Sequence, residues 1–438
     1  MSTAAALPPR PRIWLITDQA PAPVRNGITL PLFNYVQGLR ELADVGLCLL
    51  EAEGAADQNP FVAESSRLFS AVLRFKLQRK GRGARLLGEL AGREMFQHGW
   101  FVATAPDTQV LSQVLAAPCL VSPMSAVAKW RALRAAADLA HANTVVAAVN
   151  DCTAAEYRFR HRATGGTTMA RIKARIDGLR APLIGRIESA LLTEYDNVLL
   201  QTQADRAAMR DLSSAAVAAK VVLAPNGVST QVLGVEPRPE LRVLFVAELS
   251  GEHGATADWL VRQVWPKVIA ALPAARLHIV GRGASPGLAA ALNTTAGVEH
   301  QSYVDDLAVV YQRVQVVLSP VFKGFGLINK TLEGMAASTV VLGPAAAFNG
   351  IAGFVPGVHG LLVSTPAADD FSKALLSALS QPALCSTMGA AARTLVREQF
   401  NWGRCIATLD RLLLDPTRDP APDLDRTAPA LRSLPRMP

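Results

Sequence analysis

The feature that most constrains this chain is a regular alternation of short apolar runs and helical patterns. The runs 12–17 and 44–50 flank a helical pattern in which Leu32 and Val36 share one face. The same order of strand, loop, helix and strand returns within 241–280. Strands joined through helices favour parallel sheets with right-handed crossovers. The pattern therefore predicts an α/β fold with two doubly wound, Rossmann-like domains that face each other across a cleft.

A proline-rich segment without periodicity marks the boundary between these domains. It spans 225–240 and begins with Pro225-Asn226-Gly227, a turn-forming sequence. At 438 residues the chain is long enough for two hydrophobic cores. We expect the following organisation: a flexible N-terminus over 1–11, a first domain over 12–224, the linker over 225–240, a second domain over 241–400, a closing helix over 401–414 and a disordered tail over 415–438.

The stretch 316–343 has the pattern of a ligand site. It reads as a buried strand, a glycine-containing loop, a short helix beginning near Leu327 and a second buried strand. Gly324 and Gly326 allow the backbone to turn and to approach a ligand closely. The free N–H groups at the start of the following helix favour an anion such as a phosphate.

Two polar side chains on that helix suit a nucleotide. Lys330 and Glu333 are three residues apart, so they lie on one helix face. A lysine can neutralise a phosphate, and a carboxylate can accept two hydrogen bonds from the hydroxyls of a ribose. A solvent-exposed ion pair of little energetic consequence is the competing interpretation. The glycines and the flanking strands favour the nucleotide site.

The first half of the chain holds two further candidates. Gly27 lies at the first strand-to-helix turn, where open α/β sheets bind ligands, although an ordinary turn glycine fits equally well. Asp151 follows the apolar run 144–149, so its carboxylate is expected at the ligand end of the sheet. A role as helix cap is the alternative for Asp151.

Two basic clusters also lie in the first half. Residues 64–94 read as a basic amphipathic helix that could lie on an anionic membrane, with a solvated helix face as the alternative. The basic residues of this segment are Arg67, Arg74, Lys76, Arg79, Lys80, Arg82, Arg85 and Arg93. The segment 158–186 repeats the bias with Arg158, Arg160, Arg162, Arg171, Lys173, Arg175, Arg180 and Arg186.

Composition narrows the class of protein. The net charge of +8 indicates an anionic partner. No apolar run approaches the length needed to cross a bilayer, and the N-terminus lacks the pattern of a secretory signal. The five cysteines are scattered without metal-site spacing. We therefore expect a cytoplasmic protein without a bound metal or cofactor, and the basic segments lack the interleaved aromatics typical of nucleic-acid binding.

Several short motifs resemble those of the retaining group 1 glycosyltransferases, which have the GT-B fold. Pro225-Asn226-Gly227-Val228 is similar to the P-N-G-V of the domain junction, and the glycines at 281 and 283 match an I-V-G-x-G strand end. The loop 324–326 followed by 330–336 resembles the G-x-G and K-x-L-E-x-M-A sequences of that family. Phe400-Asn401-Trp402 is similar to the sequence that precedes its last helices.

The resemblance implies transfer of a sugar, with retained anomeric configuration, from a UDP- or GDP-linked donor to a glycan or lipid-linked acceptor. It suggests a role in surface polysaccharide or glycoconjugate biosynthesis, on the inner face of the membrane, without a metal. Glu333 would bind the donor ribose, Lys330 would hold the diphosphate, and Gly27 would approach it from the first domain. The expected donor-binding set is Gly27, Gly324, Phe325, Gly326, Asn329, Lys330 and Glu333, and Asp151 is the candidate catalytic base.

The chain also departs from the family. Phe325 stands at the spacing of a common sugar-contacting glutamate, and the usual Arg and Lys after the first strand of the second domain are absent. The helix exit has Ser338 and Val340 in place of glycine and proline. Two alternatives follow from the resemblance: a nucleotide-sugar epimerase of the same fold, or a degenerate binding subunit that pairs with an active transferase.

Overall fold

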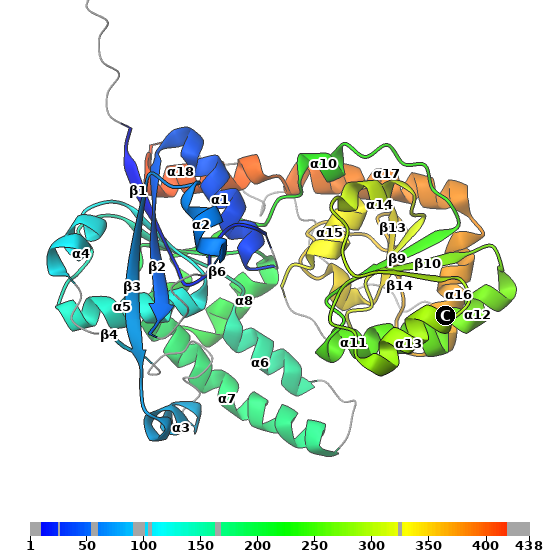
Figure 1. Ribbon diagram of the computed structural model, residues 1–438, viewed down its shortest axis with the longest axis horizontal. Helices are drawn as coiled ribbons and strands as arrows, with labels where there is room; N and C mark the ends of the chain where they lie inside the picture. Colours follow the sequence, from blue (N-terminus) through cyan, green and yellow to red (C-terminus); the bar gives the residue numbers. More distant parts are fainter. Residues whose placement is uncertain are drawn as a thin grey trace, which may run out of the picture. The chain divides into compact units, whose positions relative to one another are not determined.

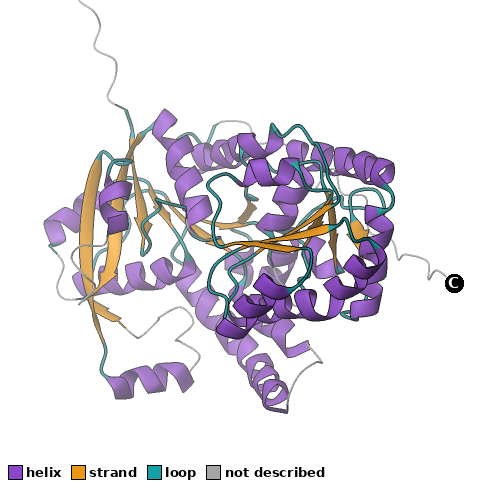
Figure 2. Ribbon diagram, turned by 45° about the vertical axis from the view of Figure 1, so that its right-hand side comes forward, coloured by secondary structure: helices purple, strands orange, loops and turns teal. Residues whose placement is uncertain are grey.

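The computed structural model describes residues 10–24, 27–53, 60–90, 101–103, 107–162, 168–322 and 326–417. Two compact units make up the chain (Figure 1). The first runs to Asn226 and also includes the segment that begins at Trp402, whereas the second spans Gly227–Asn401. Each unit contains a sheet covered by helices on both faces (Figures 1 and 2). The expected fold class, two doubly wound α/β domains, is confirmed.

The sheet of the first unit has eight strands in the order β4-β3-β2-β1-β5-β6-β7-β8. All neighbouring strands are parallel except β3 and β4, which run antiparallel at one edge. The strands are β1 (Arg12–Thr17), β2 (Asp44–Ala52), β3 (Ala71–Arg79), β4 (Phe101–Ala103), β5 (Cys119–Val121), β6 (Val145–Asn150), β7 (Asn197–Leu200) and β8 (Val221–Leu223).

The helices of the first unit include one from the far end of the chain. α18 packs against α1, and its Cys405 and Leu409 join a core that contains Leu32 and Leu47. Trp402 meets the ring of Tyr35 edge-on, with 6.2 Å between centroids. The helices are α1 (Thr29–Leu42), α2 (Pro60–Ser66), α3 (Arg82–Leu90), α4 (Thr108–Leu115), α5 (Met124–Ala137), α6 (Thr153–Arg162), α7 (Thr168–Leu192), α8 (Gln203–Leu212), α9 (Ala215–Ala218) and α18 (Trp402–Leu413).

The basic segment 64–94 does not form the expected amphipathic helix, so that prediction was wrong. Its centre is the strand β3, preceded by α2 and followed by α3. Phe75 and Leu77 are buried while Arg74 and Lys76 are exposed, an alternation with the period of two of a strand. Arg74 forms an ion pair of 2.7 Å with Glu51 on the neighbouring strand. The apolar residues within 68–77 have a spacing close to that of a helix. Hydrogen-bonded pairing with β2 nevertheless makes this segment a strand.

The second unit has a six-stranded, fully parallel sheet in the order β11-β10-β9-β12-β13-β14. Successive residues of its central strands face opposite sides: Val243 and Phe245 enter one core, and Leu244 enters the other. The strands are β9 (Arg242–Val246), β10 (Arg276–Val280), β11 (Val298–Gln301), β12 (Val316–Leu318), β13 (Val340–Gly343) and β14 (Leu361–Leu362).

Helices cover both faces of this second sheet (Figure 2). A π-helical turn, Leu260–Val264, joins α11 to α12, and a 3₁₀ turn spans Ala345–Phe348. The helices are α10 (Thr230–Leu233), α11 (Gly251–Trp259), α12 (Trp265–Ala271), α13 (Pro286–Thr294), α14 (Leu307–Gln312), α15 (Asn329–Ala336), α16 (Ala368–Leu379) and α17 (Pro382–Gln399). No helix in the described part of the chain has the length and apolarity that crossing a bilayer requires.

The strand order places a switch point in each sheet. In the second unit the chain builds β9, β10 and β11 outward and then returns to place β12 on the other side of β9. In the first unit the same reversal separates β1 from β5. Adjacent loops diverge at such points and leave a crevice at the carboxyl ends of the two strands, which is where α/β sheets bind ligands.

The chain passes between the units twice, and the two crossings are held together. The backbone N–H of Val228 donates to Phe400 O over 3.0 Å, and Val228 forms a bridge with Asn401. Farther along the linker, Arg393 of α17 donates to the carbonyl of Val235 over 2.7 Å. The segment that leaves the first unit is thus tied to the segment that returns to it.

Candidate functional site

A cavity of about 260 Å³ lies at the switch point of the second sheet. Phe245 of β9 forms part of its wall, and Lys330 reaches it from α15. The other lining residues come from the start of α11 and from the loop after β12: Glu252, His253, Ala255, Thr256, Pro320, Val321 and Phe322. The cavity therefore combines an apolar wall with three ionisable side chains.

Lys330 is the central cation of this cavity. It is half-buried, and its ammonium lies over the ring of Phe245, 5.3 Å from the centroid. Desolvation lowers the pKa of Lys330 to about 8. Within the residues that the structure describes, the ammonium of Lys330 has no ion pair or hydrogen bond. A partly desolvated ammonium without an anionic partner attracts an anion strongly, because water screens it less than at an open surface.

Glu333 lies one turn after Lys330 on α15, as the spacing predicted. Desolvation raises the pKa of Glu333 to about 7, and a hydrogen bond from Tyr311 partly offsets this rise. The Tyr311 hydroxyl donates to Glu333 Oε2 over 3.1 Å, and Tyr311 itself is buried. This bond fixes the orientation of the carboxylate, so Tyr311 is a positioning residue that the sequence did not single out.

The loop before α15 is only partly described. Gly326 is buried with φ +82°, a backbone conformation that favours glycine. Gly324 and Phe325 lie outside the described residues. The helix begins at Asn329 rather than near Leu327, since Ile328 is still extended. Asn329 and Lys330 thus stand in the first turn, and Ser319 holds this turn to β12 through a 2.8 Å hydrogen bond with Thr331.

The loop between β9 and α11 leads to His253, a residue that the sequence analysis did not single out. Gly281 allows the approach of this loop, because a Cβ there would come within 1.7 Å of Ala247 O. Leu249 then bonds to Arg282 O over 2.7 Å, and His253 follows in the first turn of α11. His253 is exposed and faces the cavity. The sequence feature that could have pointed to His253 is its position shortly after the first strand of the second domain.

The two candidates of the first half belong to the first unit. Gly27 is exposed in the turn before α1. Asp151 directly follows β6 and keeps an exposed surface. Even so, desolvation by the surrounding protein, followed by the charges of Asp205, Glu156 and Glu188, raises the pKa of Asp151 to about 8. The structure brings Gly326, Asn329, Lys330 and Glu333 together in the second unit.

The carboxyls around Asp151 have structural partners. Glu188 of α7 accepts hydrogen bonds from the backbone N–H groups of Thr153 and Ala154, at 3.0 and 3.2 Å, and so caps α6. Asp205 accepts from Cys152 N at 2.9 Å. Burial raises the pKa of Glu188 to about 7 and that of Asp205 to about 6. These groups hold the loop after β6 in place.

The switch point of the first sheet holds a buried ion pair that the sequence analysis missed. Asp18 directly follows β1, and its Oδ2 accepts from Lys129 Nζ over 2.8 Å. Lys129 comes from α5, and both side chains are largely buried. Because the partners are 111 residues apart, no local pattern points to them.

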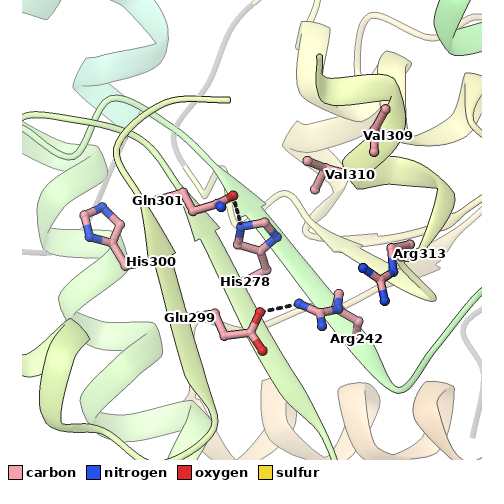
Figure 3. A pocket seen from close by; sticks show the side chains of 8 residues that line it. All are labelled: Arg242, His278, Glu299, His300, Gln301, Val309, Val310 and Arg313. Atoms are coloured by element: carbon pink, nitrogen blue, oxygen red, sulfur yellow. Dashed lines mark hydrogen bonds and ion pairs between the residues drawn. The ribbon is translucent and has the colours of Figure 1, made fainter. Parts of the chain in front are cut away.

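A second cavity of about 530 Å³ lies on the other side of β9 (Figure 3). Arg242 pairs with Glu299, and His278 bonds to Gln301 Oε1 over 2.9 Å. Arg313 also pairs with Glu240, at 2.7 Å. The lining residues are Arg242, His278, Glu299, His300, Gln301, Val309, Val310 and Arg313. Both arginines of this cavity already have carboxylate partners. An anion is therefore expected to bind less favourably here than in the cavity that contains Lys330.

Comparison with known proteins confirms the resemblance for the second unit and the fold of the whole chain. Residues 240–381, about a third of the chain, match the family model described as Glycosyl transferases group 1. No curated protein matches the chain by sequence.

Solved glycosyltransferases share its GT-B fold at low sequence identity. The complex of Anabaena Alr3699/HepE with UDP-glucose has a TM-score of 0.60 and 14% identity, over 92% of this chain and 99% of that chain. A TarM variant from S. aureus, in complex with UDP and other ligands, gives 0.62 and 10%, over 92% and 100%. Sucrose-phosphate synthase from Thermosynechococcus elongatus gives 0.60 and 17%, over 92% and 98%.

Proposed function

We propose that this GT-B chain, whose second unit matches the group 1 glycosyltransferases, is a retaining glycosyltransferase that uses a nucleoside diphosphate sugar. The donor would be a UDP- or GDP-sugar, and the acceptor a glycan or a lipid-linked precursor in polysaccharide or glycoconjugate biosynthesis. One observation carries this proposal. At a sheet switch point, the ammonium of Lys330 has no anionic partner among the described residues, and the oriented carboxylate of Glu333 lies one turn further along the same helix.

The two side chains divide the recognition of the donor between them. Lys330 would contact the diphosphate and stabilise the negative charge that develops when the sugar–phosphate bond breaks. Glu333 would accept hydrogen bonds from the ribose hydroxyls, with Tyr311 holding it in place. Gly324, Phe325, Gly326 and Asn329 would line the path of the phosphates, and Gly27 would contact the donor from the first unit. Cationic side chains and backbone N–H groups supply the stabilisation that a metal ion provides elsewhere.

The acceptor side would belong to the first unit. We assign Asp151 as the group that takes the proton from the attacking acceptor hydroxyl. The alternative recipient is the departing phosphate oxygen itself, on the face of the sugar from which the nucleoside diphosphate leaves. The Asp151→Asn variant, treated in the Discussion, separates these two routes.

A membrane surface is the proposed location of the acceptor. Ile176, Leu179 and Leu183 of α7 are 45%, 82% and 39% exposed, and Arg175 and Arg186 are exposed on the same helix. Apolar side chains flanked by arginines match a bilayer with anionic headgroups. The basic β3–α3 segment leads to the same end of the first unit as the α6–α7 pair (Figures 1 and 2).

Vesicle sedimentation tests this contact. Wild-type protein should co-sediment with vesicles containing phosphatidylglycerol, and Leu179→Asp should reduce the bound fraction several-fold because it places a charge in the apolar face. Leu384→Asp on α17 is the matched control, since Leu384 is also exposed, at 49%. Equal sedimentation of the two variants would remove the membrane from the proposal.

Nucleotide binding tests the function itself. A thermal-shift screen with UDP, GDP, ADP and TDP should show stabilisation by one diphosphate. A ligand at 100 times its Kd contributes about 2.7 kcal/mol, which raises the melting temperature by several degrees. Lys330→Ala and Glu333→Ala should each abolish this shift. Glu299→Ala, a carboxylate of the other cavity, should keep it.

The same screen distinguishes the alternatives. Absence of a shift with all four diphosphates contradicts the proposal and favours a binding subunit that pairs with an active transferase. Conversion of a nucleotide sugar to its epimer without any acceptor would identify an epimerase of the same fold.

A further inference from the structure

The cavity at the switch point of the second sheet contains a second basic side chain besides Lys330. His253 and Glu252 stand in the first turn of α11, and Lys330 stands in the first turn of α15. The His253 imidazole has no hydrogen bond or ion pair among the described residues. The imidazole is therefore available to a ligand in the same space as the lysine ammonium.

The charges around His253 are close enough to influence its protonation. Desolvation and then the positive charge of Lys330 lower the pKa of His253, while Glu252 and Glu248 act in the opposite direction. Lys330 lies on α15, Glu252 on α11 and Glu248 in the loop after β9, so charged groups from each of these segments act on the imidazole. Without a ligand, the lowered pKa of His253 favours the neutral imidazole.

A diphosphate reverses the electrostatic balance. Its two negative charges would neutralise Lys330 and favour a proton on the neighbouring imidazole. We infer that His253 is a second contact to the donor diphosphate and that it takes up a proton from solvent when the diphosphate binds. This inference rests on the proposed function and extends it, since it adds a second basic side chain of the same cavity to the diphosphate site.

The consequence is a donor affinity that depends on pH. A group that is neutral in the free protein and protonated in the complex strengthens binding as pH falls, by at most tenfold per pH unit. Lys330 and Glu333 also titrate in this range, with pKa values of about 8 and 7. The contribution of His253 is therefore the difference between wild type and a variant that lacks only the imidazole.

Calorimetry with UDP-glucose provides the test. The phosphates of a sugar nucleotide lack the terminal group that titrates near pH 6, so the charge of the diphosphate stays constant. Titrations at pH 5.5 to 8.5, each in two buffers of different ionisation enthalpy, report both affinity and proton uptake. The variants are His253→Gln, His253→Lys and the control His359→Gln, a histidine of the same unit that does not line the cavity.

We expect wild type and His359→Gln to take up a proton and to gain affinity towards low pH relative to His253→Gln, by roughly three- to tenfold at pH 6. His253→Lys should bind at least as tightly as wild type at pH 8, without the proton uptake. Identical pH profiles and proton uptake in wild type and His253→Gln would overturn the inference and leave the proposed function intact. Absence of UDP-glucose binding to all variants, together with no shift in the diphosphate screen, would overturn both.

Discussion

At the scale of single residues, the proposed function depends on ionisable groups whose surroundings move their pKa values towards neutrality. Lys330, Glu333 and Asp151 have pKa values of about 8, 7 and 8, and desolvation is the main cause in each case. Such shifts cost folding free energy, and they are common where proteins bind or transform ligands. The environment of these candidate residues therefore points to a ligand site independently of the sequence pattern.

Asp151 gives a prediction with a defined pH dependence. Because its pKa is raised to about 8, the carboxylate that accepts a proton becomes populated as pH rises, so kcat should increase from pH 6 to pH 8. Asp151→Asn should lower kcat by about 100-fold and remove this rise, while the affinity for the donor stays unchanged. A kcat within threefold of wild type would instead assign the proton to the departing diphosphate oxygen.

Residue-level prediction from sequence worked where the motif is local and failed where partners are distant. The spacing of Lys330 and Glu333 placed them on one helix, and the structure confirms this. Tyr311, 22 residues before Glu333, and Lys129, 111 residues after Asp18, are brought to their partners only by the order of the strands. The sequence alone does not give that order.

At the scale of elements, continuous apolar runs predicted strands well, whereas segments rich in charged residues were predicted poorly. The strand over 12–17 has the expected bounds as β1, because consecutive apolar residues there are buried on both sheet faces. In β3 the apolar and basic residues alternate along a single strand, whereas the apolar residues within 68–77 have the loose spacing of a helix. Hydrogen bonds to β2 decide between the two, and pairing of this kind cannot be read from one segment.

The contact between α17 and the end of α15 yields a stability prediction. A Cβ on Gly389 would stand 2.1 Å from Ser338 O, in the turn where Ser338 has φ +62°. Gly389→Ala should therefore destabilise the second unit by about 2 to 4 kcal/mol, because backbone atoms must move. Gly287→Ala in α13 is the control: a Cβ there meets nothing within 4 Å. Equal melting temperatures for the two variants would contradict this packing.

At the scale of the whole molecule, the C-terminal helix belongs to the unit that begins the chain. Leu409 of α18 is fully buried in the core built from β1, β2 and α1. Leu409→Ala should cost about 2 to 5 kcal/mol. We expect hydrogen exchange to accelerate in β1 and α1 but not in β9 and β12. Acceleration confined to α18, or spread evenly over both sheets, would argue against this division of the chain.

The return of α18 also sets the order of events during synthesis. The first unit leaves the ribosome with its α1 face uncovered, and the helix that covers this face is made only after all of Gly227–Asn401. At roughly 5 to 20 residues per second, that interval lasts on the order of 10 to 35 s. The second unit is contiguous, so it can fold to completion while the first still waits. A nascent chain that stops short of Trp402 would therefore expose the apolar side chains of α1 and become a substrate for chaperones or proteases.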